Sequence, residues 1–199
     1  MDWKILYSHR TDEALMARVQ KGDARAMTVL YERYNRRLLV FFRRMLGGKQ
    51  VAEDMLQETF LHLIDRAGLY DSAKKFSTWL FCIAYNLCKN EYRRRQRRKS
   101  SATIEDLLHS DYPLADNLTV DLHEEITSRF FLEAVFRELE KLGPERKSLF
   151  LLRCQQELSV HEIAEITGLA EGTVKSRLFY INKILADRLE SFHPSPHKA

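Results

Sequence analysis

The 199-residue sequence has no apolar run that approaches the ~18 residues of a membrane-spanning helix. Its first residues, MDWKILYSHR, also lack the succession of basic, apolar and small-residue segments that makes a signal peptide. We therefore expect a cytoplasmic protein that does not insert into a membrane.

The sequence is also poor in the residues of metal sites and in the motifs of catalysis. Its three cysteines, Cys82, Cys88 and Cys154, form no CxxC pair and no zinc spacing, so we expect buried, reduced thiols and no metal site. The chain has no Gly-rich phosphate loop, no HExxH, no HxE with PCxxC and no carboxylate cluster for two metals. These absences argue against an enzyme, and we expect no cofactor.

A helix-turn-helix pattern occupies residues 158–185. Ser159 and Glu162 have the spacing of a capping box, in which the hydroxyl accepts from the first turn and the carboxylate reaches back. Thr167-Gly168 then supplies the stop that a short turn between helices needs. The second helix has one apolar face, which consists of Val174, Leu178, Ile181 and Leu185.

The opposite face of this second helix is left for a ligand. It carries Gly172, Thr173, Ser176, Phe179, Tyr180 and Lys183, with Lys175 and Arg177 on its flanks. Small polar residues with basic flanks suit the major groove of DNA, where base edges and phosphates are contacted together. The alternative is a solvated helical hairpin, but the capping box, turn glycine, apolar stripe and basic flank all favour DNA binding.

The helix expected at about 49–67 has an unusual polar side. Its apolar arc consists of Ala52, Leu56, Phe60 and Leu63. The other side gathers Asp54, Gln57, Glu58 and Leu61. This stripe is either a solvated face, which the residues alone favour, or a docking patch for a basic partner surface.

A longer helix is expected at 76–99, after a polar break at residues 68–75. Its predicted buried stripe is Leu80, Ile83, Ala84 and Leu87. The residues predicted to point outward are Thr78, Tyr85, Lys89, Tyr92, Arg93 and Gln96. Aromatic residues interleaved with cations are typical of single-strand binding, because bases stack on rings while phosphates meet cations.

The end of this helix is strongly basic. Residues 89–99 hold seven basic residues and one acidic residue. Cations favour a helix C-terminus, but this excess is larger than that role needs, and we interpret it as phosphate contact. The candidates for holding unstacked bases are Phe76, Trp79, Tyr85 and residues 68–75, with Tyr85 the most clearly outward and Trp79 open to a packing role.

The charge then reverses, because residues 100–128 contain seven acidic residues and no Lys or Arg. This segment is predicted to be a mostly flexible tether. By default its acidity keeps the linker soluble; the alternative is that it occupies a nucleic-acid channel.

Amphipathic helices resume after the tether. The sequence therefore predicts an all-α protein with two small helical domains, at 12–99 and 126–191, joined by an acidic flexible linker at 100–125.

With these segments placed, the chain resembles the extracytoplasmic-function (ECF) branch of the sigma-70 family of bacterial RNA polymerase sigma factors, across nearly its whole length. AEDMLQETFLHLI is similar to the family's region 2.2, which docks on the beta-prime clamp helices of core polymerase. The resemblance implies a polymerase-binding set of Asp54, Gln57, Glu58, Phe60 and Leu61.

Two further blocks carry the resemblance. KFSTWLFCIAYNLCKNEYRRRQRR resembles regions 2.3 and 2.4, which capture the non-template strand of the minus-10 element. The implied set is Asp71, Lys75, Phe76, Trp79, Tyr85, Lys89, Tyr92, Arg93 and Arg94. LGPERKSLFLLRCQQELSVHEIAEITGLAEGTVKSRL resembles region 4, which reads the minus-35 element and meets the polymerase flap. The implied set is Glu171, Gly172, Thr173, Lys175, Ser176, Arg177 and Tyr180.

The chain departs from the family pattern in two places. Phe179, Tyr180 and Ile181 stand where a His/Arg-rich stretch is usual, and Glu91 stands where an aspartate is common. The resemblance implies core RNA polymerase, promoter DNA and an anti-sigma factor as partners.

We weigh three functions: a promoter-specificity subunit without chemistry of its own, a stand-alone repressor or activator that binds DNA through residues 158–185, and an enzyme acting on nucleic acid. The resemblance favours the first. Co-purification with core polymerase separates it from the second, because a repressor should bind a specific duplex alone.

Overall fold

The computed structural model describes residues 3–101 and 122–190, without the side chains of 99–101 and 122–129. Every regular element in these ranges is a helix, which confirms the all-α class. The helices are α1 (Trp3–Ser8), α2 (Asp12–Val19), α3 (Ala24–Leu46), α4 (Lys49–Asp65), the 3-10 turn η1 (Ala67–Leu69), α5 (Phe76–Ser101), α6 (Leu122–Lys141), α7 (Pro144–Cys154), α8 (Val160–Thr167) and α9 (Glu171–Arg188). Most of the predicted acidic tether lies outside the described residues. Among the described helices, none combines the length and apolar character needed to cross a membrane.

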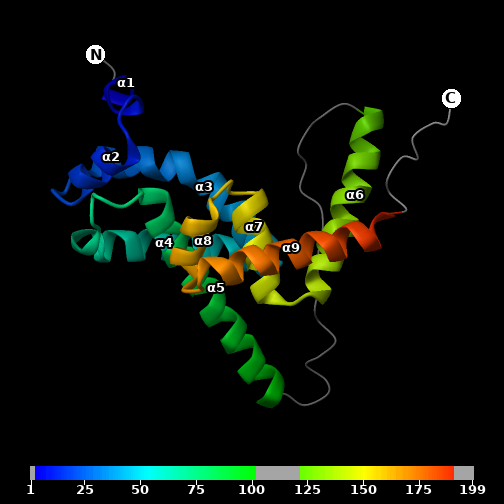
Figure 1. Ribbon diagram of the computed structural model, residues 1–199. Helices are drawn as coiled ribbons and strands as arrows, with labels where there is room; N and C mark the ends of the chain where they lie inside the picture. Colours follow the sequence, from blue (N-terminus) through cyan, green and yellow to red (C-terminus); the bar gives the residue numbers. More distant parts are fainter. Residues whose placement is uncertain (1–2, 102–121, 191–199) are drawn as a thin grey trace.

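The N-terminal half, α1 to α5, is built around α3, which packs against α2, α4 and α5 (Figure 1). Asp23 caps α3 by accepting the backbone N–H groups of Arg25 and Ala26 at 3.0 and 3.3 Å. At the other end, Gly47 and Gly48 have φ values of 67° and 68°, which L side chains rarely adopt, and they turn the chain sharply into α4. The resulting core is rich in aromatic rings.

The C-terminal half, α6 to α9, contains the predicted helix-turn-helix. Ser159 Oγ accepts the N–H of Glu162 at 3.2 Å, and Glu162 Oε2 accepts the N–H of Ser159 at 2.8 Å. Gly168 ends α8 in the left-handed conformation with a φ of 73°. The predicted capping box and turn are thus present. Their effect is to fix the angle at which α9 leaves α8.

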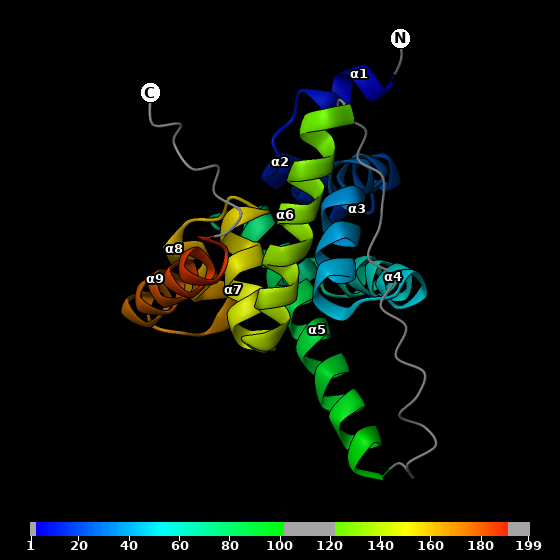
Figure 2. The same cartoon turned by 90° about the vertical axis from the view of Figure 1, so that its right-hand side faces the viewer.

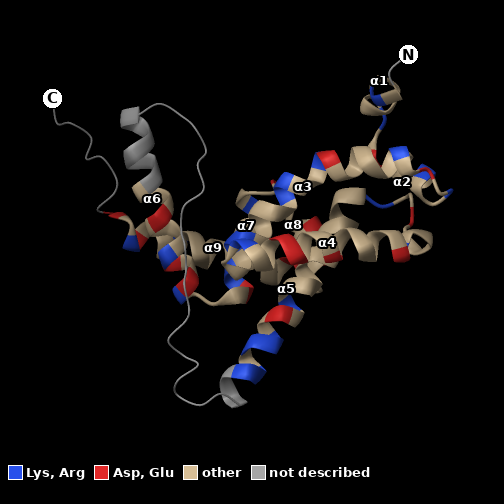
Figure 3. Ribbon diagram, turned by 180° about the vertical axis from the view of Figure 1, so that it is seen from behind, with Lys and Arg blue, Asp and Glu red and all other residues tan. Residues whose placement is uncertain are grey.

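The two halves pack against each other. Helix α8 lies along α5, and α7 lies against α3 (Figures 1 and 2). The C-terminal part of α5 projects from this body, and its ribbon is mostly coloured for Lys and Arg residues (Figure 3). The structure therefore shows one packed body with a basic arm.

Candidate nucleic-acid interface

The acidic face of α4 is exposed as predicted. Asp54 and Gln57 are exposed, Glu58 is half-exposed, and Leu61 keeps 61% of its surface accessible. Ile64, which lies one turn further along, is also exposed at 52% and was missed by the sequence analysis. The described surface therefore joins acidic and apolar residues on one face of a helix, which suits a protein partner.

Phe60 differs from the rest of the implied polymerase-binding set. It is 6% exposed, as its place on the apolar arc of α4 predicts, and its ring lies 4.8 Å from that of Tyr31. A buried ring cannot touch a partner directly. Its role is to hold α4 on α3, so that the acidic face is presented in a fixed position.

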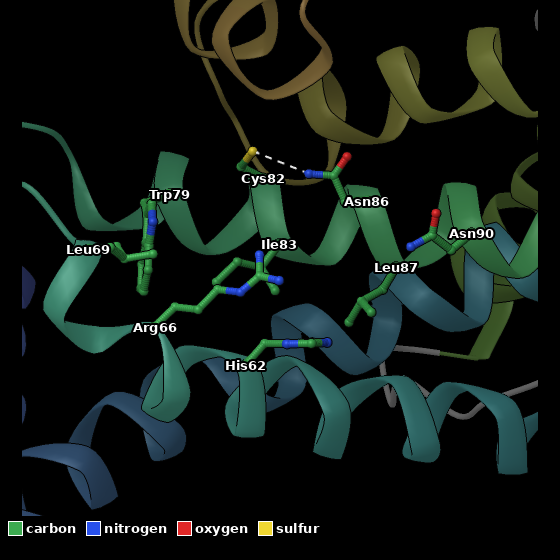
Figure 4. Close-up of a pocket in the computed structure, with 9 residues that line it drawn as sticks. All are labelled: His62, Arg66, Leu69, Trp79, Cys82, Ile83, Asn86, Leu87 and Asn90. Carbon is green, nitrogen blue, oxygen red and sulfur yellow. Dashed lines mark hydrogen bonds between the residues drawn. The ribbon is translucent and has the colours of Figure 1, made fainter.

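A pocket of about 220 Å³ lies where α4, η1 and the middle of α5 meet (Figure 4). Its walls are apolar or aromatic, with polar groups from His62, Arg66, Asn86 and Asn90 around them. Trp79 and Leu69 stand at one end, and the Arg66 side chain extends from the end of α4 toward α5 (Figure 4). Asn86 Nδ2 donates to Cys82 Sγ at 3.6 Å. A largely apolar lining with a few hydrogen-bonding groups can hold a small planar ring.

The pocket shows which residues the sequence analysis missed. Trp79 was a candidate open to a packing role, and it lines the pocket while its ring lies 5.2 Å from that of Tyr70. Arg66, Asn86 and Asn90 were not candidates. The two asparagines could have been predicted from the sequence. They lie four residues apart, and helical spacing places both on the same side of α5 as Trp79.

The structure corrects the orientation of several residues on α5. Phe76 was a candidate for base contact but is fully buried, with its ring 5.3 Å from that of Tyr34. Thr78 was predicted to point outward and is 7% exposed. Tyr92 was also predicted outward, but it is half-buried and its hydroxyl donates to the carbonyl of Met45. These errors share one cause: α5 is buried on two sides instead of one.

Tyr85, predicted to be the clearest outward ring, faces the C-terminal half. Burial raises the pKa of its hydroxyl, and Glu145, Ser148 and Arg177 of that half lie close enough to affect it. Lys75 Nζ pairs with Glu162 Oε1 at 3.1 Å, while its side chain stays largely exposed. Asp71 remains at the surface, where its carboxylate accepts the N–H of Ala73 at 3.0 Å.

The basic arm of α5 contains one buried acid. Glu91 is 6% exposed and pairs with Arg94 at 2.6 Å and with Arg95 at 2.9 Å. Burial disfavours its charged form, but the hydrogen bonds from the two arginines outweigh burial and lower the pKa of Glu91. Lys89 and Arg93 are exposed on the arm, as the phosphate-contact interpretation requires.

Helix α9 follows the predicted pattern. Its apolar stripe is buried: Val174, Leu178, Ile181 and Leu185. Of the implied minus-35 set, Glu171, Gly172, Lys175, Ser176 and Tyr180 are exposed, whereas Thr173 and Arg177 are half-exposed.

Two ion pairs already involve this face of α9. Arg177 Nη1 lies 3.2 Å from Glu145 Oε2, and His161 Nδ1 lies 2.9 Å from Glu171 Oε1. The hydrogen bond to Glu171 raises the pKa of His161. Phe179 and Tyr180 are both more than half exposed and meet edge to face at 5.7 Å. The face therefore combines cations with an exposed aromatic pair.

Comparison with known families matches both halves of the chain. Residues 30–98 match sigma-70 region 2, and residues 132–179 match sigma-70 region 4. The ECF RNA polymerase sigma-E factor of Haemophilus influenzae is 30% identical over 188 residues, which cover 90% of this chain and 96% of that protein. The RNA polymerase sigma-H factor of Pseudomonas aeruginosa is 30% identical over 190 residues, which cover 93% of this chain and 97% of that protein.

Two solved structures share the fold. CnrH in complex with the cytosolic domain of CnrY superposes with a TM-score of 0.68 at 21% identity, over 92% of this chain and 99% of that one. The sigma factor RpoE in complex with the anti-sigma factor NepR from Bartonella quintana superposes with a TM-score of 0.64 at 21% identity, over 77% of this chain and 89% of that one.

Proposed function

The chain belongs to the ECF sigma factors of the sigma-70 family, and we propose that its N-terminal half binds core polymerase and the minus-10 element while its C-terminal half reads the minus-35 element. It is an RNA polymerase sigma factor, a class of protein that is non-enzymatic. Of the three functions weighed from the sequence, the stand-alone repressor or activator and the enzyme are therefore set aside. The division into domains and the residues of each site are our proposals.

The acidic face of α4 is proposed to dock on the beta-prime clamp helices. The exposed side chains Asp54, Gln57 and Glu58 supply charge and hydrogen bonds, and Leu61 and Ile64 supply apolar area. Charge complementarity of this kind selects the partner, and the apolar residues beside it supply affinity.

The pocket between α4 and α5 is proposed to hold one unpaired base of the minus-10 element. This pocket is the observation that carries the proposal. Its 220 Å³ are below the roughly 300–1,000 Å³ of sites for drug-sized ligands, which favours a smaller ligand such as a single base. Stacking on an aromatic ring is worth about 1–3 kcal/mol per base, which offsets part of the few kcal/mol that flipping costs.

The basic arm of α5 extends from the pocket and is proposed to follow the phosphates of the same strand. On the arm, Lys89 lies between the pocket residues Asn86 and Asn90, and Arg93 follows Asn90 by three positions. The base pocket and the phosphate contacts thus adjoin, which is the arrangement that capture of a melted strand needs.

The exposed face of α9 is proposed to enter the major groove at the minus-35 element. Thr173 and Ser176 are placed to read base edges, with Lys175 and Arg177 beside them for phosphates. We also propose the polymerase flap and an anti-sigma factor as partners. In support of the latter, RpoE of Bartonella quintana is seen in complex with the anti-sigma factor NepR.

Promoter opening tests the proposed function. Asn86→Ala and Arg66→Ala should reduce open-complex formation by the holoenzyme on duplex promoters, because both remove polar groups from the pocket. The loss should be smaller on templates already unpaired at the minus-10 element. Permanganate reactivity of the melted bases measures both.

The matched control is Asn35→Ala, which makes the same chemical change on α3 away from the pocket. Binding to core polymerase should be equal for all three variants. If the pocket variants open duplex promoters as well as the wild type, the pocket does not hold a base.

A further inference from the structure

Helix α9 exposes two aromatic rings next to each other. Phe179 keeps 65% of its surface accessible, and Tyr180 keeps 60%. The ring centroids lie 5.7 Å apart, and the ring planes meet at 75°, edge to face. Water solvates apolar surface poorly, so a pair of rings left open on one helix indicates a ligand that has an apolar group of its own.

The aromatic pair continues the face of α9 that the proposed function assigns to the bases. Ser176 lies three residues before Phe179 and four before Tyr180, so helical spacing makes the three side chains neighbours on one surface. Ser176 is exposed, and Thr173 lies one turn before it. The rings therefore lie one turn beyond the small polar residues, on the same side of the helix.

The charge around the aromatic pair suits nucleic acid. Residues 172–186 contain three cations, Lys175, Arg177 and Lys183, and no acidic residue. Lys175 and Lys183 are exposed, and Arg177 is half-exposed. Cations beside the pair can contact phosphates while the rings face the base edges of the groove.

The small size of the aromatic pair argues against a protein partner at this place. Two aromatic side chains have at most about 500 Å² of surface between them. Each partner of a stable protein interface buries roughly 800 Å². Helix α9 is described over its whole length, and no third large apolar side chain on it is exposed to a similar degree. The apolar group that the pair meets is therefore a small one.

Only one group in the major groove of DNA fits this description. The base edges there present hydrogen-bond donors and acceptors, and the single apolar group among them is the C5-methyl group of thymine. The side chain of Phe179 can neither donate nor accept a hydrogen bond. Against any other base edge it would displace water from a polar group without replacing the hydrogen bond.

We propose that Phe179 and Tyr180 together contact the C5-methyl group of a thymine in the minus-35 element, and that this contact makes the thymine part of the sequence that the protein selects. The inference rests on the proposed function, because the rings reach a base only if α9 lies in the major groove. The cations hold the helix on the duplex whichever base is present, whereas the rings discriminate between bases.

Helix geometry predicts where this thymine lies. Tyr180 follows Thr173 by seven residues, which is about 10 Å along the helix axis at about 1.5 Å per residue. One base-pair step is about 3.4 Å. A helix that lies along the groove therefore places the thymine about three base pairs from the base that Thr173 contacts.

The first step of the test finds the position of the thymine. The holoenzyme is allowed to bind a promoter library in which the minus-35 and minus-10 elements are randomised. The sequences enriched by the wild type should carry a thymine at one fixed position of the upstream element. Thr173→Ala should change the preference at a different position, about three base pairs away, because it removes a contact to another base.

The second step removes the methyl group alone. Uracil in place of this thymine keeps every hydrogen-bonding group and should weaken binding by the wild type about fourfold, the value of one buried methyl group. For the same reason 5-methylcytosine at this position should be bound more tightly than cytosine. Phe179→Ala and Tyr180→Ala should each lower the ratio of thymine to uracil affinity, and the double variant should bind both promoters equally.

Two variants serve as matched controls. Tyr180→Phe keeps the ring and loses only the hydroxyl group, so it should keep the thymine-to-uracil ratio of the wild type. Phe130→Ala truncates a phenylalanine of similar exposure, 62%, on α6, and it should also keep this ratio. All variants should bind core polymerase as the wild type does, because none of them changes the acidic face of α4.

The outcomes separate this inference from the proposed function. If the wild type binds the uracil promoter as tightly as the thymine promoter, the inference is wrong. It is also wrong if Phe179→Ala and Tyr180→Ala lose affinity at an unchanged thymine-to-uracil ratio, because the rings then touch something other than the methyl group. In both cases a preference that changes with Thr173 still supports the proposed role of α9. If the library enriches no upstream element, that role fails and the inference fails with it.

Discussion

Helices α5 and α9 are both expected to meet DNA, but they are surrounded differently. Helix α9 buries a single stripe and leaves the rest of its surface to solvent. Helix α5 is buried against α3 and α4 on one side and against α8 on another, so that Phe81 and Cys88 are fully buried. A helix at the edge of a fold leaves most of its outer face accessible, whereas a helix between two layers is covered on two sides.

The two helices differ most in the burial of their aromatic residues. The largest effect is therefore expected when the loss of stability in Phe81→Ala on α5 is compared with that in Phe179→Ala on α9. Phe81 lies 5.7 Å from Phe41 and is fully buried, so its truncation should cost about 3–5 kcal/mol of unfolding free energy. Phe179 is 65% exposed, and its truncation should stay within about 0.5 kcal/mol. Urea unfolding of both variants measures this, and equal losses would contradict the contrast between the helices.

An intermediate effect is expected for Glu162→Gln, with Glu171→Gln as its exposed counterpart. At neutral pH Glu162→Gln should cost about 1–2 kcal/mol, because glutamine can keep the capping box but loses the charge that strengthens the hydrogen bonds with Ser159 and Lys75. Glu171→Gln should cost less than about 0.5 kcal/mol. Burial raises the pKa of Glu162, but its hydrogen bonds with Ser159 and Lys75 outweigh burial and lower it. The difference in unfolding free energy between the wild type and Glu162→Gln should therefore change with pH.

A folded-state pKa below the unfolded value makes the contribution of Glu162 fully present above about pH 4.3. The contribution is lost as the pH falls through the lowered pKa. Unfolding measured at several pH values should therefore show the gap between wild type and Glu162→Gln shrinking in acid. A gap that stays constant down to about pH 2 would mean that the charge of Glu162 is not what stabilises the contact.

A smaller effect is expected for the binding of duplex DNA by α9. Arg177→Ala on α9 should weaken binding of the holoenzyme to most duplexes alike and lower the salt slope by about 1, because a phosphate contact is lost. Changes at Thr173 or Ser176 should instead alter which bases are preferred. Arg36→Ala, an exposed arginine on α3, is the matched control. If the salt slope of Arg177→Ala is unchanged, the proposed orientation of α9 on the duplex is wrong.

The smallest effect is expected at His161, which joins the two helices of the helix-turn-helix. Its pKa is raised by the hydrogen bond to Glu171, so the interaction is fully present below the unfolded pKa of histidine and is lost as the pH rises through the folded value. Glu171→Gln should bring the pKa of His161 down toward its ordinary value in an NMR titration, with no measurable change in fold. An unaltered titration would show that the pair does not form in solution.

The features that could be predicted from the sequence are those that depend on residues close together in the chain. The capping box at Ser159, the left-handed Gly168 and the exposed face of α9 all depend on residues within a few positions of one another. Periodicity was sufficient for α9 because only one side of this helix is covered. The acidic face of α4 was predicted for the same reason.

The residues that cover α5 could not be predicted, because they come from distant parts of the chain. Thr78 and Glu162 are 84 positions apart, and Arg37 and Gln156 are 119 apart, so no local pattern could indicate that these residues meet. The pocket likewise needs Arg66 from the end of α4 together with Asn86 and Asn90 from α5. An amphipathic pattern predicts only which side of a helix is apolar and which is polar. Polar residues such as Thr78 and Lys147 are buried because a distant segment supplies their hydrogen bonds.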